Sequence, residues 1–246
     1  MTKQVVSIYG YGRFGKLWAE ILSTHFDIQV YSRRGIQQNE VKEGIRIVSF
    51  EQLFNCDVMF FCVAISAMEE VLAKNKDNFK TNCLYIDTCS VKVYPVQWMK
   101  TYLPSGVHII GTHPMFGPDS YYKNNKQHPI VLSNINASEL EYLKWLNFFK
   151  SIGLKVEEMT PDEHDKIAAY SQGITHYIGR VLSDLNLKPN AISTMGYQKL
   201  LDIIQQTCND DWQLFLDLQY YNPYTKNMRK ELHNSLEKIY SLFENK

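Results

Sequence analysis

The sequence predicts an α/β protein, a Rossmann-type doubly wound and mostly parallel sheet followed by an all-α C-terminal domain. Residues 4–9 form a short apolar segment that runs directly into a Gly10-x-Gly12-x-x-Gly15 motif. Short apolar segments then alternate with helical patterns, which is typical of parallel strands joined by helices. From Thr160 onward only helical patterns follow. We therefore expect one domain over residues 1–159 and a helical domain over residues 160–246.

The composition is that of an ordinary globular protein and excludes several classes of function. The chain has 246 residues, 45% of them hydrophobic and 21% charged, which is enough for two domains. Lys plus Arg and Asp plus Glu both number 26, so we expect neither nucleic acid nor a membrane surface as a partner. The five cysteines lack CxxC spacing, and because the first strand begins within a few residues of Met1 we expect no leader peptide. We therefore expect reduced thiols in a cytoplasmic protein.

The glycine motif lies between a strand and a helix, where it has a physical mechanism. Gly10 would allow a tight turn, Gly12 would let the backbone approach a pyrophosphate, and Gly15 would let helix and strand pack closely. The helix that follows would offer free amides to the phosphates. We predict a dinucleotide site here and include Arg13 and Phe14 in it. One apolar helix face follows at the spacing of an α-helix: Phe14, Leu17, Trp18, Ile21 and Leu22.

The end of the second strand indicates which dinucleotide binds. Residues 28–31 form this strand, and Ser32-Arg33-Arg34 follows it. An NAD site usually has Asp or Glu at this point, bonded to the ribose 2′-hydroxyl. A hydroxyl and two guanidinium groups instead suit a 2′-phosphate. We therefore predict NADP as the cofactor, the alternative being two solvated surface arginines.

Two further apolar segments end at the same edge of the predicted sheet. Residues 57–63 form a strand that is apolar after Asp57, as a central parallel strand covered on both faces is. The turn that follows, at Val63 and Ala64, is assigned to the cofactor site. Residues 83–87 form the next strand, and Ser90 follows it in a loop at the carboxyl edge. The alternative is that Ser90 only caps a helix.

The main catalytic candidate is His113. It follows an apolar strand at residues 107–110 and precedes a polar loop at residues 120–126, with two glycines and two prolines close by. Such a histidine should be exposed in a crevice, with its direction set by stiff neighbours. Open α/β sheets place their chemistry at such strand ends. The alternative is a loop histidine that caps a turn.

The C-terminal region should fold into helices that are broken near Pro189 and Pro223. Their apolar faces are more extensive than a small isolated bundle can bury, so we expect a homodimer. Gln172 and His176 are four residues apart and should share one helix face. His164 should lie about 120° around that helix from His176, and we predict no metal site.

Four motifs, in this order, resemble the prephenate/arogenate dehydrogenase family, most closely its plant-type NADP-dependent arogenate dehydrogenases. The resemblance covers essentially the whole chain. It implies oxidative decarboxylation of a cyclohexadienol substrate in tyrosine biosynthesis. The motifs are Gly10-x-Gly12-x-x-Gly15, Asp87-x-x-Ser90-Val91-Lys92, His113-Pro114-Met115-Phe116-Gly117-Pro118, and Glu163-His164-Asp165 through His176.

The resemblance also implies roles for individual residues. His113 would accept a hydrogen bond from the ring hydroxyl of the substrate, and Ser90 would bond to the same hydroxyl. Because a neutral imidazole is required, activity should fall as His113 becomes protonated. His176 would contact the substrate from the helical domain. The substrate-binding set is Thr112, Gln172, His176, Lys199 and Asp210.

One departure from the family pattern bears on the substrate. Bacterial prephenate dehydrogenases commonly hold a substrate carboxylate with an arginine, and Asp202 stands at the matching position here. The nearby cation is Lys199. An acidic pocket would favour arogenate, which carries an ammonium group, and Asp210 is the candidate for that contact.

Several alternatives stay open. The chain could prefer prephenate and make 4-hydroxyphenylpyruvate. Its fold would also suit a β-hydroxyacid dehydrogenase or an imine reductase, although no catalytic lysine stands out after Thr160. A catalytically silent NADP-binding regulator would be expected to lack Ser90 or His113, and both are present.

Overall fold

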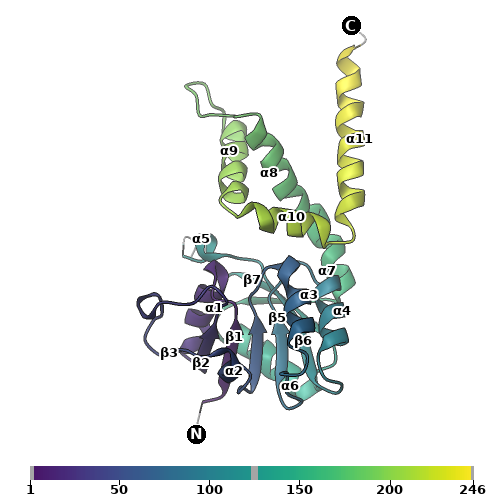
Figure 1. The fold of residues 1–246 in the computed structure, drawn as a ribbon. Coiled ribbons are helices and arrows are strands. Elements are labelled where there is room, and N and C mark those ends of the chain that lie inside the picture. The colour runs from purple at the N-terminus through teal and green to yellow at the C-terminus, as the bar shows by residue number, and fades with distance from the viewer. Residues whose placement is uncertain (1–2, 123–126, 245–246) are drawn as a thin grey trace. The chain divides into compact units, whose positions relative to one another are not determined.

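The computed structural model describes residues 3–122 and 127–244. The chain divides into two compact units, Met1–Pro161 and Asp162–Lys246, here called the first and second unit (Figure 1). The end of the polar loop predicted at 120–126 lies outside the described residues. So do Met1 and Thr2, on which the expectation of no leader peptide partly rests.

The described strands of the first unit form one eight-stranded sheet in the order β3-β2-β1-β4-β5-β6-β7-β8. All neighbouring strands run parallel except β6 and β7. The predicted fold class, a doubly wound and mostly parallel sheet followed by helices, is therefore confirmed. The strands are β1 (Val5–Tyr9), β2 (Asp27–Tyr31), β3 (Ile45–Ile47), β4 (Val58–Phe61), β5 (Leu84–Asp87), β6 (His108–Pro114), β7 (Pro129–Asn134) and β8 (Lys155–Glu158).

The strand that breaks the parallel pattern, β7, follows a connection with little helix in it. Among its described residues this connection holds one helix, the short α5 (Pro118–Tyr121). A parallel return to the sheet usually needs a full crossover helix, whereas an antiparallel return does not. Helix α5 also corrects the sequence prediction, because Ser120 and Tyr121 belong to it and not to a loop.

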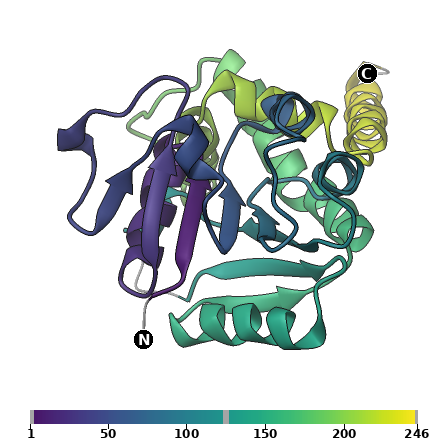
Figure 2. The same cartoon turned by 60° about the horizontal axis from the view of Figure 1, so that its bottom comes forward.

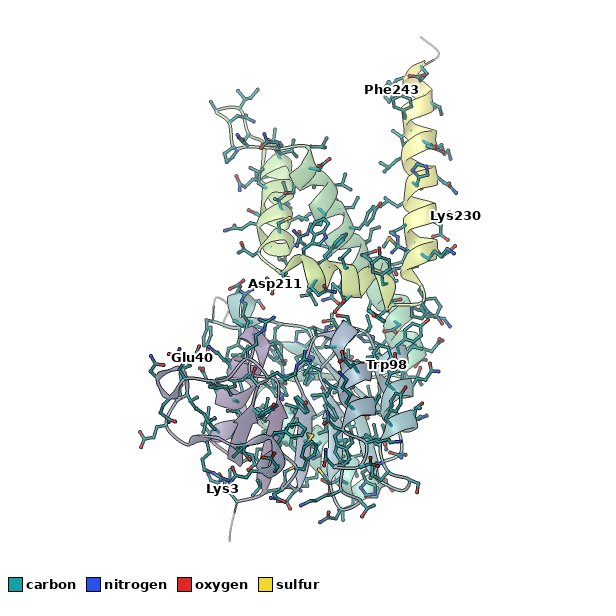
Figure 3. All side chains as sticks on the ribbon, in the orientation of Figure 1. Lys3, Glu40, Trp98, Asp211, Lys230 and Phe243 are labelled. Atoms are coloured by element: carbon teal, nitrogen blue, oxygen red, sulfur yellow. The ribbon has the colours of Figure 1, made fainter. Side chains whose placement is uncertain are left out.

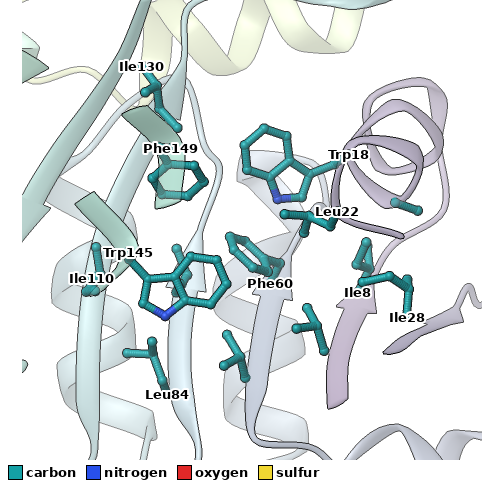
Figure 4. Packing of buried hydrophobic residues seen from close by; sticks show 14 of the residues in the cluster. Ile8, Trp18, Leu22, Ile28, Phe60, Leu84, Ile110, Ile130, Trp145 and Phe149 are labelled. Atoms are coloured by element: carbon teal, nitrogen blue, oxygen red, sulfur yellow. The ribbon is translucent and has the colours of Figure 1, made fainter. Parts of the chain in front are cut away.

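Helices cover both faces of the sheet, and the main core lies under two of them. On one face Trp18 of α1 and two aromatic residues of α6, Trp145 and Phe149, surround Phe60 of β4 with ring centroids 5.4–5.8 Å apart (Figure 4). Each fully buried side chain of this kind contributes roughly 1.5–3 kcal/mol. On the other face α3 and α4 lie side by side (Figure 2). The longer helices of this unit are α1 (Arg13–Ser23), α3 (Ile65–Lys74), α4 (Val93–Tyr102) and α6 (Glu139–Ser151), and the short ones are α2 (Phe50–Leu53) and the 3₁₀ turn η1 (Gln38–Glu40).

The regular elements of the second unit are all helical, as predicted from Thr160 onward. The long helix expected there is interrupted, because a π-helical turn separates α7 from α8. Helices α8 and α9 pack closely at Gly179, where a Cβ would lie 2.0 Å from Oγ1 of Thr207. In the described residues of the chain, no helix combines the length and the apolar character needed to cross a membrane. The elements are α7 (Pro161–Ala168), the π-turn η2 (Ala169–Gly173), α8 (Ile174–Asp184), α9 (Met195–Cys208), α10 (Trp212–Tyr220) and α11 (Thr225–Glu244).

Candidate functional site

The glycine turn after β1 has the geometry of a close approach between strand and helix. Gly10 has a φ of +107°, and its amide donates a hydrogen bond to the carbonyl of Tyr31 at 2.9 Å. A Cβ on Gly15 would lie 2.0 Å from the carbonyl oxygen of Gly10, so a side chain is excluded there. A Cβ on Gly12 would meet none of the described atoms within 4 Å. Gly12 therefore leaves room for a ligand to approach the backbone.

The first turn of α1 presents backbone amides beside this glycine turn. The amide of Lys16 donates to the carbonyl of Gly12 at 2.9 Å, and the amides of Arg13, Phe14 and Gly15 precede this first helical bond. The first turn holds no acidic side chain. Amides at a helix start, with the positive end of the helix dipole, bind phosphate groups.

Two side chains predicted to bind the cofactor make contacts within the protein. The guanidinium of Arg13 pairs with the carboxylate of Asp119 at 2.8 Å, with both side chains about half exposed. The ring of Phe14 stacks on Trp18, with centroids 5.5 Å apart. The contact that these two residues offer a phosphate is therefore through their backbone amides.

The end of β4 completes the turn. Val63 lies next to Gly10, and its Cγ1 would be 3.1 Å from a Cβ at that glycine. Ala64 is exposed and directly precedes α3. The carboxyl ends of β1 and β4, which are paired strands, thus bring Val63 and Gly10 together.

A cavity of about 250 Å³ lies at the carboxyl ends of β1 and β2. Tyr9 and Tyr31, the last residues of these strands, line it together with Arg33. Lys74 and Glu70 of α3 also line it and form an ion pair with each other. The charge of Lys74 is therefore matched, and Arg33, two residues after the end of β2, is a further cation that lines this cavity.

The other two residues predicted at the end of β2 lie in a tight turn. The amide of Arg34 donates to the hydroxyl of Ser32 at 3.4 Å, and the amide of Gly35 donates to the carbonyl of Ser32 at 3.1 Å. Arg33 and Arg34 are both exposed. An exposed turn with two guanidinium groups suits an anionic ligand.

A buried ion pair joins the carboxyl ends of β5 and β6. Asp87, the last residue of β5, lies opposite Gly111 of β6. Nζ of Lys92 donates to Oδ2 of Asp87 and to the carbonyl of Thr112, the latter at 2.5 Å. Both charged side chains are fully buried. Burial raises the pKa of the Asp87 carboxyl above its usual range, while the charge of Lys92 opposes this rise.

Thr112 belongs to this network. Its hydroxyl donates to the carbonyl of Asp87 at 2.6 Å, and its amide donates to Oδ1 of Asp87 at 3.3 Å. Thr112 is fully buried. The hydroxyl and the amide of Thr112 thus both donate within the protein, and the contact of Thr112 with substrate stays a prediction. The network holds the loop that carries Ser90 beside the strand that carries His113.

His113 lies within a strand and not in an exposed loop. The predicted strand ended at residue 110, but β6 continues to Pro114 because β7 pairs with it antiparallel. His113 lies opposite Val131 and is 2% exposed. The sheet therefore fixes the backbone of His113 near the carboxyl end of β6, and Ser90 is half-buried in the loop after β5.

In the second unit, Gln172 and His176 follow one another along one helical segment. Gln172 lies in the π-turn η2, and His176 lies in α8. Single π-turns inside helices occur often at functional sites. His176 is 8% exposed, and burial, together with the nearby charge of Arg180, lowers its pKa to about 4. The imidazole of His176 is therefore neutral near pH 7.

Asp210 is joined to this segment by a residue that the sequence analysis missed, Arg180. Nη2 of Arg180 donates to the backbone carbonyl of Asp210 at 2.8 Å. Asp210 lies between α9 and α10 and precedes Asp211, the N-cap of α10 (Figure 3). Arg180 is four residues after His176, so helical spacing could have placed the two on one face.

Lys199, the other predicted substrate residue, lies on the exposed side of α9. Asp202, which stands where the resemblance expects an arginine, lies one turn further along and accepts a hydrogen bond from Nε2 of Gln198 at 3.1 Å. Across the described part of the chain, no group of three or more His, Cys, Asp or Glu side chains has an arrangement that could hold a metal ion.

Comparisons with known proteins match both units. Residues 28–158 match the model of the prephenate dehydrogenase nucleotide-binding domain, and residues 181–246 match a model described as TYRAAT1-like, C-terminal domain. The chain is 32% identical to arogenate dehydrogenase 2, chloroplastic, of Arabidopsis thaliana, over 95% of this chain and 68% of that protein.

Two solved structures share the fold. Prephenate dehydrogenase from A. aeolicus, in complex with hydroxyphenyl propionate and NAD⁺, has a TM-score of 0.74 at 17% identity and covers 100% of this chain and 92% of its own. Synechocystis arogenate dehydrogenase has a TM-score of 0.68 at 18% identity, with 98% and 92% covered. The family model over residues 28–158 and the 32% identity to the plant relative show that the chain belongs to the prephenate dehydrogenase family.

Proposed function

We propose that the chain catalyses the NADP-dependent oxidative decarboxylation of arogenate to tyrosine. The observation that carries the proposal is the arrangement of β5 and β6, whose carboxyl ends hold Ser90 and His113 through the buried Asp87–Lys92 pair. Family membership and the 32% identity to a plant arogenate dehydrogenase support the same activity.

The chemistry follows from the substrate. Loss of a hydride from the carbinol carbon and of carbon dioxide from across the ring makes the ring of arogenate aromatic. His113, in its neutral form, accepts the proton of the ring hydroxyl as the hydride leaves, and Ser90 bonds to the same oxygen. When bound, the oxidised nicotinamide supplies the acceptor for the hydride. The phenol regains its proton from His113, so the base is restored.

The first unit fits a dinucleotide phosphate. A Cβ at Gly12 would occupy open space that a pyrophosphate needs, and the amides of Arg13, Phe14 and Gly15 follow directly in the first turn of α1. Arg33 lines the cavity at the end of β2, where a 2′-phosphate would require a cation. These features support NADP over NAD.

The cofactor preference is tested by replacing Arg33 with glutamine and measuring dissociation constants for NADP⁺ and NAD⁺ by calorimetry. A charge-assisted bond to phosphate is worth about 1.5–3 kcal/mol, so NADP⁺ should bind roughly tenfold to a hundredfold more weakly. Binding of NAD⁺ should not change. Lys76→Gln, at another cation of the chain, is the control, and equal weakening for both dinucleotides would contradict the NADP proposal.

The second unit supplies the groups proposed for the rest of the substrate. Gln172 and His176 offer an amide and a neutral imidazole, and Lys199 offers a cation on α9. Asp210 would pair with the ammonium group of arogenate. The Asp210→Asn variant should therefore gain preference for prephenate, and an unchanged ratio of the two substrates would contradict this assignment.

We also propose a cytoplasmic homodimer. Helix α11 carries exposed apolar side chains at helical spacing, Leu236, Ile239, Tyr240 and Phe243. Figure 3 labels Phe243 near the end of this helix. The five cysteines are free thiols, which favours a reducing compartment. Light scattering of the purified protein, beside a Leu236→Glu and Phe243→Glu double variant, tests the dimer: the wild type should have twice the mass of the variant.

The activity is tested by following NADPH formation at equal concentrations of arogenate and prephenate. Faster turnover of arogenate is the expected result, and His113→Asn should lower kcat by about 10²–10⁴-fold. Faster turnover of prephenate would favour the alternative, a prephenate dehydrogenase. If a folded wild type that binds NADP⁺ turned over neither substrate, the chain would be a cofactor-binding regulator.

A further inference from the structure

Three polar side chains line one face of the helical segment that begins at the π-turn of the second unit. They are Gln172, His176 and Arg180, spaced four residues apart, and such residues are neighbours on a helix surface. Each has one buried polar atom without a hydrogen-bond partner in the part of the chain that the structure describes: Oε1 of Gln172, Nδ1 of His176 and Nε of Arg180. A buried polar atom rarely lacks a partner. Three such atoms along one helix face, here called the row, indicate a surface whose missing hydrogen bonds a polar ligand would supply.

Arg180 is held rigidly at one end of this row. Its Nη2 donates to the carbonyl of Asp210 at 2.8 Å. Its guanidinium carbon lies 4.8 Å from the ring centroid of Trp212 and 5.6 Å from that of Phe215, both on α10. A guanidinium fixed by stacking and by one hydrogen bond keeps its other donors in a set direction. Planar guanidinium donors match the two oxygens of a carboxylate.

The charges of the three side chains in the row favour an anionic ligand. His176 is neutral near pH 7 because burial disfavours its protonated form. Gln172 has no charge, so Arg180 is the cation of the row. The bond to the Asp210 carbonyl uses Nη2 and leaves the buried Nε without a partner. A carboxylate is the ligand group that satisfies this donor and balances the charge.

We propose that Arg180 binds the side-chain carboxylate of the substrate, the α-carboxylate that arogenate shares with tyrosine. This inference rests on the proposed function. It also explains how the chain can hold that carboxylate although Asp202 stands where related bacterial enzymes are expected to carry an arginine. Arg180 supplies the guanidinium from α8 instead.

The link between Arg180 and Asp210 suits an α-amino acid. The carboxylate and the ammonium of such a group are attached to one carbon, so their binding residues must be close together. The hydrogen bond from Arg180 to the backbone carbonyl of Asp210, at 2.8 Å, places the guanidinium beside the residue that carries this acid. Arg180 would bind the carboxylate, and Asp210 would bind the ammonium.

The test compares three ligands that differ in these two groups. L-Tyrosine has both the carboxylate and the ammonium, tyramine has only the ammonium, and 3-(4-hydroxyphenyl)propionate has only the carboxylate. Isothermal titration in the presence of NADP⁺ gives their dissociation constants for the wild type, Arg180→Gln and Arg180→Lys. Arg229→Gln is the matched control, because Nη1 of Arg229 is bonded within the unit to Oε1 of Gln219 at 2.8 Å.

Arg180→Gln should weaken tyrosine and hydroxyphenylpropionate by at least about tenfold and change tyramine by less than about threefold. Arg180→Lys should lie between, since it keeps the charge and loses the planar donors. Asp210→Asn should show the reverse selectivity and weaken tyramine. Equal weakening of all three ligands by both Arg180 variants would mean that Arg180 only supports the fold, and would overturn the proposal.

Failure of this inference can be told from failure of the proposed function. If the wild type forms NADPH from arogenate and binds tyrosine, but the Arg180 variants keep tyrosine affinity, the inference alone is wrong. If the wild type neither turns over arogenate nor binds tyrosine, both are wrong. If circular dichroism shows that Arg180→Gln does not fold, Arg180→Lys decides the test. A lower ratio of tyrosine to tyramine affinity than in the wild type supports the inference, and an unchanged ratio overturns it.

Discussion

Replacing Lys92 by methionine should destabilise the first unit, because it leaves the carboxylate of Asp87 buried without its cation. Both side chains are fully buried, and removing one partner of such a pair costs about 3–5 kcal/mol. Asp87 would keep the hydrogen bonds from the amides of Cys89 and Thr112, at 3.0 and 3.3 Å. Because these bonds continue to stabilise the charge, we expect the lower end, about 3 kcal/mol at pH 8.

The loss should depend on pH, because the group left alone is an acid. Burial already raises the pKa of Asp87, and the substitution removes the positive charge that lowers it. A carboxyl with a folded-state pKa above its unfolded value, about 3.9 for Asp, is most stable in the fold when protonated. Its favourable contribution is full below about pH 4 and is lost as the pH rises through the folded pKa. The difference between variant and wild type should therefore widen as the pH rises from about 4 toward 8.

The assay is urea unfolding at several pH values between 5 and 8, followed by the fluorescence of the buried Trp18 and Trp145 in the first unit. Lys155→Met is the matched control, because Lys155 pairs with Glu157 on the surface, with side chains 61% and 44% exposed, and such pairs contribute about 0–1 kcal/mol. A loss below about 1 kcal/mol at pH 8, or one that is the same at every pH, would refute the reasoning.

Three further substitutions test the site in other ways. Gly12→Ala should leave the melting temperature unchanged and weaken NADP⁺ binding at least tenfold by calorimetry, since its Cβ meets no described atom. Gly15→Ala should instead lower the melting temperature, since its Cβ would lie 2.0 Å from the carbonyl of Gly10, and equal effects of the two substitutions would contradict these roles. Because burial lowers the pKa of His176 to about 4, His176→Gln should leave the acidic limb of the pH–kcat profile between pH 5 and 8 in place. A shifted limb would show that His176, and not His113 alone, must be neutral for catalysis.

The parts of the fold that could be predicted from sequence are those set by local patterns. The strand before Gly10, the helix after it and the helical region after Thr160 follow from apolar spacing and from glycine stereochemistry. The positive φ of Gly10 and the close contact at Gly15 bear out the predicted turn.

The parts that could not be predicted depend on contacts between distant residues. His113 was expected in an exposed loop, yet pairing with β7 extends β6 through Pro114 and buries it. The two hydrogen bonds that Thr112 donates to Asp87 likewise join residues 25 positions apart, and no local pattern marks them. Arg180 had no motif to mark it, and its importance appears only when its contacts with Asp210 and Trp212 are known.

The Asp87–Lys92 pair and the row of Gln172, His176 and Arg180 differ in how far the protein itself satisfies their polar groups. This difference helps to distinguish groups that stabilise the fold from groups that bind a ligand. In the first unit Asp87 and Lys92 neutralise each other, and their remaining polar groups bond to the backbone, so this charge serves the fold. In the second unit the Nε of Arg180 and the Nδ1 of His176 have no partner among the described residues. Each such atom costs about 1–3 kcal/mol in the absence of a partner. A few atoms of the first unit, Nε1 of Trp18 and Trp145 and Oε1 of Glu141, also lack a partner among the described residues, but the second unit places three such atoms along one helical segment, where one ligand can reach them together. We therefore regard the Asp87–Lys92 pair as the support of the proposed catalytic residue His113, and the row as the surface proposed to bind the substrate.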